Sequence, residues 1–459
     1  MNITIISDAS YITLGNHTVT MAKALKERGH RVSVILPFYE TIYSDIKNRF
    51  KATGSYRVNI PQGEFNIDIY QTDDEGVNYY FLANSRIFAR EKTWGYHDDA
   101  LRSCVFCTAA LNLLLKSETQ TEYIITDTPN TALVPVFIKF KYNIYSTLRN
   151  AKTFHCINTN HYGIFDRSTV TSVFGIPPEE KHLLLCNNEV NLTKAAIICS
   201  SRVFIGENAL DILYDQRNDI HHTAVQFGFK IRKLRAGIDY STFSPETDSD
   251  IHKMFSATSI NCKVENKLFV QRYLYLKENA DIPLVALYPD TNKDIYTMYI
   301  RELIRCDIQL ILISNNISHS TLKSLPDKCV CIRDNSAETL KNVFSASDIC
   351  VFGGFNSPCG NPAYIAAAYG CVPVLPYHRF FDHGFTYFNK LTLEGNGFTI
   401  DPQSQKDLLY SLWDVLAIYR HDKKTYYKLL QNTMKKVFSA TDCLDSIEKE
   451  AEKTVYSFI

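Results

Sequence analysis

Glycine is scarce in this sequence, with 18 residues in a chain of 459. Enzymes that bind nucleotide diphosphates usually place glycine in the loops that approach the phosphates, because a residue without a Cβ lets the backbone come close. The scarcity therefore counts against an enzyme of that kind. Long apolar runs are missing as well, since no stretch approaches the roughly 20 residues that span a bilayer. We therefore expect no membrane partner.

An excess of charge of either sign is also missing, because Lys and Arg together number 49 and Asp and Glu together number 49. This balance gives no electrostatic reason to expect nucleic acid or an anionic membrane surface as the main partner. The first residues, MNITIISDAS, lack the basic region and cleavage site of a secretory signal and instead predict a β-strand. We therefore expect a cytoplasmic protein.

The cysteines show no paired pattern, because the 13 residues are odd in number, scattered and mostly within apolar runs. This distribution predicts buried free thiols and not a disulfide framework. One C-x-x-C pair, Cys104 and Cys107, lies in a stretch of helical periodicity without a second Cys or His pair. Helix packing is the favoured interpretation, and a metal or redox role is the weaker alternative.

The chain alternates short apolar runs with helical patterns, and its length predicts two domains. A strand at 2–7, a helix at 16–30 and a strand at 31–37 predict a parallel sheet with a right-handed crossover. Runs at 66–71 and 77–83 predict an antiparallel pair near the sheet edge. A helix and three further segments of this sheet are expected at 98–116, 123–127, 153–158 and 195–206.

A polar, turn-forming stretch around Pro245 predicts a domain boundary, so the expected domains are residues 1–245 and 246–459. Beyond it the alternation starts again, and residues 403–459 form a helical tail. The pattern predicts a second doubly wound α/β domain. Its strands are expected at 283–289, 308–314, 329–334, 348–354 and 372–376, and its helices at 294–305, 336–347 and 361–370.

Six segments of this sequence resemble, in consistent order, bacterial glycogen synthases and plant starch synthases. They are MAKALKERGHRVSVILPFY, AREKTWGYHDDALRSCVFCTAAL, NLTKAAIICSSRV, AGIDYSTFSPETD, SDICVFGGFNSPCG and AAAYGCVPVL. The resemblance identifies the chain as a member of glycosyltransferase family five. It implies a GT-B fold, in which two Rossmann-like doubly wound domains face a cleft.

The same resemblance implies what each domain binds. ADP-glucose or UDP-glucose would bind mainly to the C-terminal domain and an α-glucan acceptor mainly to the N-terminal one, with no metal and no cofactor. Without a metal, the departing diphosphate has to be stabilised by Lys, Arg, helix N-termini and backbone N–H groups. The residues at the family's motif positions therefore indicate whether this chain retains the family's catalytic chemistry.

The first motif of the family, a Lys followed by Gly-Gly-Leu-Gly-Asp, falls on the segment that begins at Ser10. Ser10 replaces the Lys, and only Leu14 and Gly15 match. Ile12 replaces a glycine, and a β-branched residue does not adopt the positive φ that glycine offers. Gly15 stays a candidate nucleotide-sugar contact, but a simple strand-to-helix turn is the favoured interpretation.

The family's His-Asn pair, which contacts the donor sugar, falls on Ile157 and Asn158. His155 lies an even number of residues from Ile157 and could share its face of the strand. A packed histidine is favoured over a sugar ligand at this position. The family's Asp in the preceding loop falls on Thr128, with Asp127 one place away.

In the C-terminal domain, the family's Arg and Lys that neutralise the diphosphate fall on Pro289 and, after a one-residue gap, on Lys293. Thr291 fits the family pattern, whereas Asp290 adds a negative charge that an anion site does not need. Thr291 and Lys293 are candidate nucleotide-sugar contacts. A surface turn is the favoured alternative.

The family's Glu beside the reacting carbon falls on Ser357, in a loop that keeps only Pro358, Cys359 and Gly360 of the motif. These three are candidate nucleotide-sugar contacts, although their retention also suits packing. Arg379 follows the next strand and is a further candidate for gripping a phosphate.

We interpret the chain as a catalytically degenerate glucosyltransferase, a pseudoenzyme that binds glucan or regulates an active synthase as its partner. One alternative is an active retaining glucosyltransferase that transfers glucose from ADP-glucose or UDP-glucose to an α-1,4-glucan, using Lys293, Arg379 and His155. The other alternative is a scaffold protein without a carbohydrate ligand.

Overall fold

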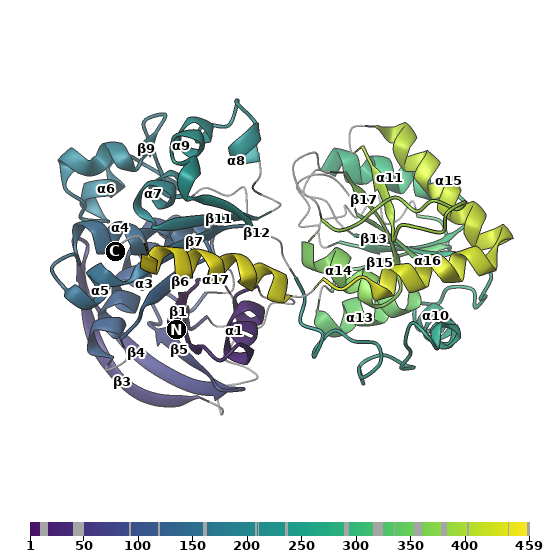
Figure 1. The fold of residues 1–459 in the computed structure, drawn as a ribbon, viewed down its shortest axis with the longest axis horizontal. Coiled ribbons are helices and arrows are strands. Elements are labelled where there is room, and N and C mark those ends of the chain that lie inside the picture. Colours follow the sequence, from purple (N-terminus) through teal and green to yellow (C-terminus); the bar gives the residue numbers. More distant parts are fainter. Residues whose placement is uncertain are drawn as a thin grey trace. The chain divides into compact units, whose positions relative to one another are not determined.

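The computed structural model forms two compact units, one of Met1–Arg235 with Thr441–Ile459 and the other of Ala236–Ala440 (Figure 1). The described residues are 1–9, 17–39, 50–90, 93–117, 120–158, 163–206, 209, 211–234, 237–288, 293–314, 325–334, 336–352, 360–377, 383–401, 404–438 and 440–456. We call the two units unit 1 and unit 2.

A mostly parallel sheet forms the centre of unit 1. Its strands are β1 (Asn2–Ile6), β2 (Arg31–Pro37), β3 (Lys51–Ile60), β4 (Gly63–Asp74), β5 (Val77–Ala83), β6 (Tyr123–Thr126), β7 (Lys152–Ile157), β11 (Arg202–Gly206) and β12 (Ile231–Leu234). Their order is β12-β11-β7-β6-β1-β2-β5-β4-β3. The pairs from β12 to β5 are parallel, and β4 joins β5 and β3 antiparallel. The antiparallel pair expected at 66–71 and 77–83 is therefore confirmed as β4 and β5.

Helices and a small sheet complete unit 1. The helices are α1 (His17–Glu27), α3 (Asp99–Lys116), α4 (Leu133–Phe140), α5 (Ser146–Asn150), α6 (Thr169–Ser172), α7 (Leu192–Cys199), α8 (Asp211–Tyr214), α9 (His221–Gln226) and α17 (Ala440–Tyr456). The small sheet contains β8 (Ile164–Phe165), β9 (Leu185–Cys186) and β10 (Glu189–Asn191). Gly29 follows α1 with φ +86 and donates its N–H to the carbonyl of Lys26, so it acts as a glycine C-cap of this helix.

Unit 2 contains a second parallel sheet. Its strands are β13 (Leu284–Tyr288), β14 (Gln309–Ile313), β15 (Cys329–Ile332), β16 (Ile349–Phe352), β17 (Val372–Pro376) and β18 (Phe398–Ile400). Their order is β15-β14-β13-β16-β17-β18, with every pair parallel. The helices are α10 (Lys263–Tyr273), α11 (Lys293–Arg305), α13 (Ala337–Ala346), α14 (Gly360–Ala368), α15 (Gln405–His421) and α16 (Lys423–Lys435).

Buried aliphatic side chains on both faces explain why these strands form parallel sheets. In β14, for example, the whole segment Gln309–Ile313 is buried. The helices that flank each sheet contribute to the same cores, with one buried apolar cluster in unit 1 and another in unit 2. Among the helices of the described part of the chain, none is long and apolar enough to cross a bilayer.

The segment 195–206 differs from its expected extended form. Its first part belongs to α7, which starts at Leu192 with Asn191 as N-cap, and only Arg202–Gly206 forms a strand. A continuous apolar run does not distinguish a buried helix from a buried strand, and here the Asn191 cap and the helical burial decide for a helix.

The boundaries of units 1 and 2 differ from those of the expected domains, residues 1–245 and 246–459. The turn around Pro245 belongs to unit 2, because Asp248 accepts hydrogen bonds from Lys341 and Tyr369. The helical tail is divided, since α15 and α16 pack in unit 2 and α17 packs in unit 1. Glu450 of α17 pairs there with Arg202 of β11 at 2.7 Å.

Candidate functional site

Polar side chains follow the carboxyl ends of β1 and β6, the two neighbouring strands between which the sheet of unit 1 reverses its order. Ser7 and Asp8 come directly after β1, and Asp127 and Asn130 come after β6. All four are buried, with exposed fractions of 8% or less. Ligands of open α/β sheets bind at such a switch point. We call these four residues and Thr18 the Asp8–Asp127 cluster and take it as the candidate site of unit 1.

Neutral hydrogen-bond donors hold both carboxylates of the cluster. Nδ2 of Asn130 donates to Oδ2 of Asp8 at 2.6 Å. The hydroxyl of Thr18, in the first turn of α1, donates to Oδ2 of Asp127 and lies 3.2 Å from Oγ of Ser7. The ends of β1 and β6 and the start of α1 are therefore joined by polar contacts.

Burial perturbs both carboxyl groups. Burial raises the pKa of Asp127 to about 6, although hydrogen bonds from Thr18 and Ser7 act in the opposite direction. Burial also raises the pKa of Asp8, against hydrogen bonds from Thr128 and Asn130. Carboxyl groups with perturbed pKa values at strand ends are typical of functional sites. Analysis of the sequence did not select Asp8, although an Asp just after an expected strand was a usable signal.

A buried guanidinium lies close enough to Asp8 for its charge to lower the pKa of that carboxyl. It belongs to Arg102 of α3, whose Nη1 donates to Oδ1 of Asp99 at 2.6 Å and whose Nε donates to the carbonyl of Ile87 at 3.0 Å. The hydroxyl of Tyr39 donates to the carbonyl oxygen of Asp8 at 3.0 Å. Two carboxylates, an amide, a phenol and a cation therefore border one small hollow of about 10 Å³, which has room for about one water molecule.

Ile157, expected from the sequence at the position of the family's sugar-contacting His, is an apolar core residue with 2% exposure at the end of β7. His155, two residues earlier, is 1% exposed, and its Nδ1 lies 2.7 Å from the hydroxyl of Thr126. Burial lowers the pKa of His155 to about 3, so its imidazole is neutral. This environment agrees with the packed-histidine interpretation.

Asn158 follows β7 and is half-buried. Its Oδ1 approaches Gly206 so closely that a Cβ at residue 206 would collide with it. Gly206 ends β11, the neighbour of β7 in the sheet. The glycine therefore makes room for the Asn158 side chain at the carboxyl edge of this sheet.

In unit 2 the strand order reverses between β13 and β16, and two candidate segments follow these strands. Tyr288 and Phe352 are the last residues of β13 and β16 and pair in register, so the chain leaves the sheet at adjacent points. The next helices, α11 and α14, begin at Lys293 and Gly360. Helix N-termini after parallel strands favour anions.

Most candidates from the sequence lie outside the described residues. They are Ser10, Gly15, Pro289, Thr291, Ser357, Pro358, Cys359 and Arg379. For Lys293 and Gly360 the structure describes the backbone position alone, and for Ile157 and Asn158 it also describes the side chains.

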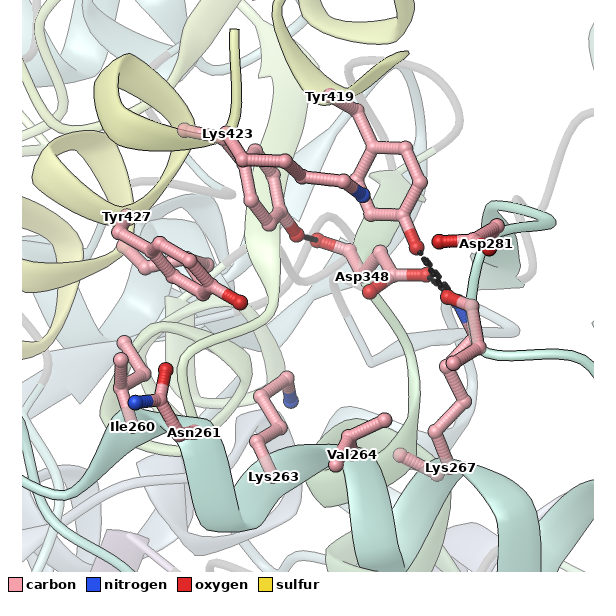
Figure 2. A pocket seen from close by; sticks show the side chains of 14 residues that line it. Ile260, Asn261, Lys263, Val264, Lys267, Asp281, Asp348, Tyr419, Lys423 and Tyr427 are labelled. Atoms are coloured by element: carbon pink, nitrogen blue, oxygen red, sulfur yellow. Dashed lines mark hydrogen bonds and ion pairs between the residues drawn. The ribbon is translucent and has the colours of Figure 1, made fainter.

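Unit 2 also contains a cavity of about 310 Å³ at the amino end of β16 (Figure 2). Figure 2 shows Lys267 beside Asp348 and Tyr419, to which its Nζ donates at 2.7 Å each. Nζ of Lys263 donates to three carbonyl oxygens at 2.8 Å, so its hydrogens are also used. These lysines stabilise the fold and lie at the end of β16 opposite to the candidate segments.

Within the part of the chain that the structure describes, no group of three His, Cys, Asp or Glu side chains could hold a metal ion. Cys104 and Cys107 are buried free thiols in α3. Their Sγ atoms lie 3.2 Å from the carbonyl oxygen of Val173 and 3.4 Å from that of Asn130. The helix-packing interpretation of this pair agrees with these contacts.

Comparison with known proteins gives both the fold class and the family. Over 99% of both chains, the structure matches the catalytic domain of starch synthase IV from Arabidopsis thaliana, solved with ADP and acarbose, with a TM-score of 0.86 and 22% identity. It also matches a sucrose-phosphate synthase from Thermosynechococcus elongatus, with a TM-score of 0.59 and 14% identity over 99% of both chains. Two α/β units with parallel sheets and this similarity define the GT-B fold.

The sequence comparison is more specific. Residues 13–209 match the family model of the starch synthase catalytic domain. The glycogen synthase of Clostridioides difficile (strain 630) is 26% identical over 445 residues, which cover 92% of each chain. The glycogen synthase of Clostridium beijerinckii is 27% identical over 442 residues, which cover 92% of this chain and 91% of that one. Together these similarities support a member of the glycogen and starch synthase family, glycosyltransferase family five.

Proposed function

We propose that this chain is a catalytically degenerate member of its family that binds an α-glucan and acts as the partner of an active synthase. The observation that carries the proposal is the environment of Ile157. An apolar core side chain stands where the family has a sugar-contacting His, and the nearest described histidine of the same strand, His155, is neutral and packed against Thr126.

The sequence supports the same conclusion at three further family positions. Ser10, Pro289 and Ser357 stand where the family has a Lys, an Arg and a Glu. Loss of one donor that stabilises a transition state costs roughly 10²–10³ in rate. Such losses are not additive, but with four of them we expect very little turnover by the family's mechanism.

The Asp8–Asp127 cluster supports retained glucan binding. Buried carboxylates and an amide can exchange hydrogen bonds with sugar hydroxyls, and they lie in the unit that corresponds to the family's acceptor side. A protein without any ligand gains nothing from two buried carboxyl groups with raised pKa values, because burial of their charge costs free energy. This argument opposes the scaffold alternative.

A second candidate is an active glucosyltransferase that uses ADP-glucose or UDP-glucose. The helix starts at Lys293 and Gly360 favour it, because both follow strands at the switch point of unit 2. An anion at these two helix N-termini would be stabilised by backbone N–H groups even without the family's Arg.

The two candidates are separated by measuring transfer of radiolabelled glucose from ADP-glucose and UDP-glucose to glycogen. The proposal predicts no transfer above a heat-inactivated control, and no rise in melting temperature with ADP, UDP or their glucose conjugates. Transfer that depends on protein concentration and is lost in Lys293→Ala would establish the second candidate.

Glucan binding is measured by affinity electrophoresis in gels that contain glycogen or amylopectin. We expect retardation of the wild-type chain and about tenfold weaker binding of Asn130→Ala, because one hydrogen bond to Asp8 is lost at the site. Asn59→Ala, on the exposed edge of β3, is the matched control and is expected to bind as the wild type. Equal mobility with and without glucan would favour the scaffold alternative.

A further inference from the structure

A second cavity of unit 1, of about 570 Å³, lies at the edge of the sheet opposite to the Asp8–Asp127 cluster. It is lined by Asn2 at the start of β1, Arg31 at the start of β2 and Asn78 near the start of β5. These are the amino ends of parallel strands, whereas the cluster follows carboxyl ends. The cavity is therefore separate from the candidate site, and its volume is within the about 300–1,000 Å³ of small-molecule pockets.

One side of this cavity is apolar. Ile69 of β4, Tyr80 of β5 and Leu113 and Leu114 of α3 line it and are only half-buried. The same four residues pack against the core of unit 1. They therefore keep apolar surface toward the cavity, where a ligand with an apolar body could cover it.

The other side of the cavity is cationic. Lys26 at the end of α1, Arg31 and Lys116 at the end of α3 line it, and its described lining contains no carboxylate. Nζ of Lys116 lies 4.7 Å above the ring centre of Tyr56, and the end of Lys26 lies beside Gly76. No ion pair of these three cations with another described residue is recorded in the structure, so three positive charges border one hollow.

The nearby carboxylates already have other partners. Oε2 of Glu122 accepts the backbone N–H of Asn2 at 2.6 Å, and Oδ1 of Asp73 accepts that of Gly76 at 3.1 Å. Lys23, which does not line the cavity, pairs with Asp74 at 3.4 Å and with Glu75 at 3.2 Å. These four carboxylates therefore have contacts with groups other than the side chains of Lys26, Arg31 and Lys116.

We propose that this cavity binds a small organic anion with an apolar body. The apolar body lies against Tyr80 and the Leu113–Leu114 side, and the anionic group pairs with Arg31 and Lys26. A guanidinium can hold a carboxylate or a phosphate through two parallel hydrogen bonds, which makes Arg31 the main contact of the anionic group. The alternative is three solvated surface cations that happen to border a hollow.

The test is calorimetric titration of the full-length chain with octanoate as the probe. We expect saturable binding of one octanoate per chain, and at least tenfold weaker binding by Lys26→Ala/Arg31→Ala. The matched control is Lys51→Ala/Arg149→Ala, which removes two exposed cations of the same unit outside the cavity and is expected to bind as the wild type. Melting temperatures of both variants check that they are folded.

Two further ligands test the two halves of the proposal. Octanol has the apolar body without the charge, and inorganic phosphate has the charge without the body. We expect both to bind at least tenfold more weakly than octanoate, and octanoate binding to weaken as salt is raised from 0.05 to 0.5 M because exposed charges are screened at about 10 Å in 0.1 M salt. Equal binding of octanol, equal binding of phosphate, or an unchanged affinity in Lys26→Ala/Arg31→Ala would each overturn the proposal. None of these readouts depends on glucan binding or on glucose transfer.

Discussion

The hydroxyl oxygen of Thr126 lies 2.7 Å from Nδ1 of His155, on the adjacent parallel strand. The two residues are directly paired in the register of β6 and β7, and both are about 1% exposed. His155 is therefore a neutral member of the core and not a ligand at the carboxyl edge of the sheet. Its burial and its contact with Thr126 argue against the alternative in which His155 serves as a sugar ligand.

The first prediction concerns the acid sensitivity that His155 confers. Its pKa is about 3 in the folded chain and 6.5 in the unfolded chain, so the unfolded state binds the proton first as the pH falls. The stabilisation is complete above pH 6.5 and is lost between pH 6.5 and about pH 3. At pH 5 the loss is about 2 kcal/mol, because each pH unit corresponds to about 1.36 kcal/mol.

His155→Gln removes this titration. We expect the difference in melting temperature between the wild type and His155→Gln to shrink from pH 7.5 to pH 5, as measured by calorimetry. His97→Gln, at an exposed position, is the control and should follow the wild type at both pH values. A constant difference between wild type and His155→Gln would show that His155 does not titrate in this way.

The second prediction concerns Asp127, whose folded-state pKa of about 6 lies above its ordinary value of 3.8. The folded chain holds this proton more tightly, so its stabilising effect is present below pH 3.8 and is lost as the pH rises to about 6. Asp127→Asn keeps an acceptor for Thr18 without the buried charge. We expect a higher melting temperature than the wild type at pH 7.5 and no advantage at pH 4.

The exposed Asp68→Asn is the control for the charge change and should alter neither melting temperature. If Asp127 belongs to the glucan site, Asp127→Asn also binds glycogen more weakly in affinity electrophoresis while it is the more stable protein. A stable variant with full glycogen affinity would remove Asp127 from the site and leave its burial as a purely structural feature.

The third prediction concerns Lys267, which is 3% exposed by its side chain and lies 2.7 Å from Asp348 (Figure 2). Lys267→Met leaves the carboxylate of Asp348 buried without its cation, and removal of one partner of a buried pair costs about 3–5 kcal/mol. We expect a large loss of stability in urea unfolding, whereas Lys277→Met, at an exposed position, changes little. In Lys267→Met/Asp348→Asn the loss should be smaller than in Lys267→Met alone; an equal or larger loss would argue against a charge penalty.

The fourth prediction concerns the attachment of α17 through Glu450. Burial alone would raise the pKa of Glu450, but hydrogen bonds from Arg232, Arg202 and Lys453 lower it to about 2. The stabilisation is therefore complete above pH 4.5 and is lost as the pH falls toward 2. Glu450→Gln weakens the charge-assisted hydrogen bonds from Arg202 and Arg232, each worth about 1.5–3 kcal/mol, and also the one from the mostly exposed Lys453.

Hydrogen exchange of the peptides of α17 measures this effect. At pH 7 we expect faster exchange in Glu450→Gln than in the wild type, and no change in the exposed control Glu452→Gln. Unchanged protection of α17 in Glu450→Gln would mean that apolar packing, including the buried Leu444 and Ile447, is sufficient to hold the helix.

Much of the fold could be predicted from local sequence pattern. The run at 31–37 and the helical pattern at 98–116 correspond to β2 and α3, since a buried parallel strand needs an apolar run and a helix against a sheet needs an apolar face. The run at 195–206 was ambiguous, because a continuous apolar run is compatible with a buried helix and with a buried strand. The strand β3 was missed because its first five residues are all exposed and its apolar alternation starts only at Tyr56.

The candidate site could be predicted only in part. The replacement of the family's His by Ile157 is a prediction that the sequence alone allows, because it depends only on which residue stands at one position. The Asp8–Asp127 cluster is not, because Asp8 and Asn130 are 122 positions apart and meet only when β1 and β6 become neighbours. The raised pKa of Asp127 follows from burial, which is a property of the folded chain.

The sequence by itself determined the two α/β units, the family and the identity of the residues at the family's motif positions, because each of these depends on local pattern or on residue type. Only the tertiary structure decided that His155 is packed and neutral, that α17 returns to unit 1, and that Lys26, Arg31 and Lys116 border one cavity. Those outcomes depend on which distant segments become neighbours, and burial and charge pairing arise only after the strands have found their order.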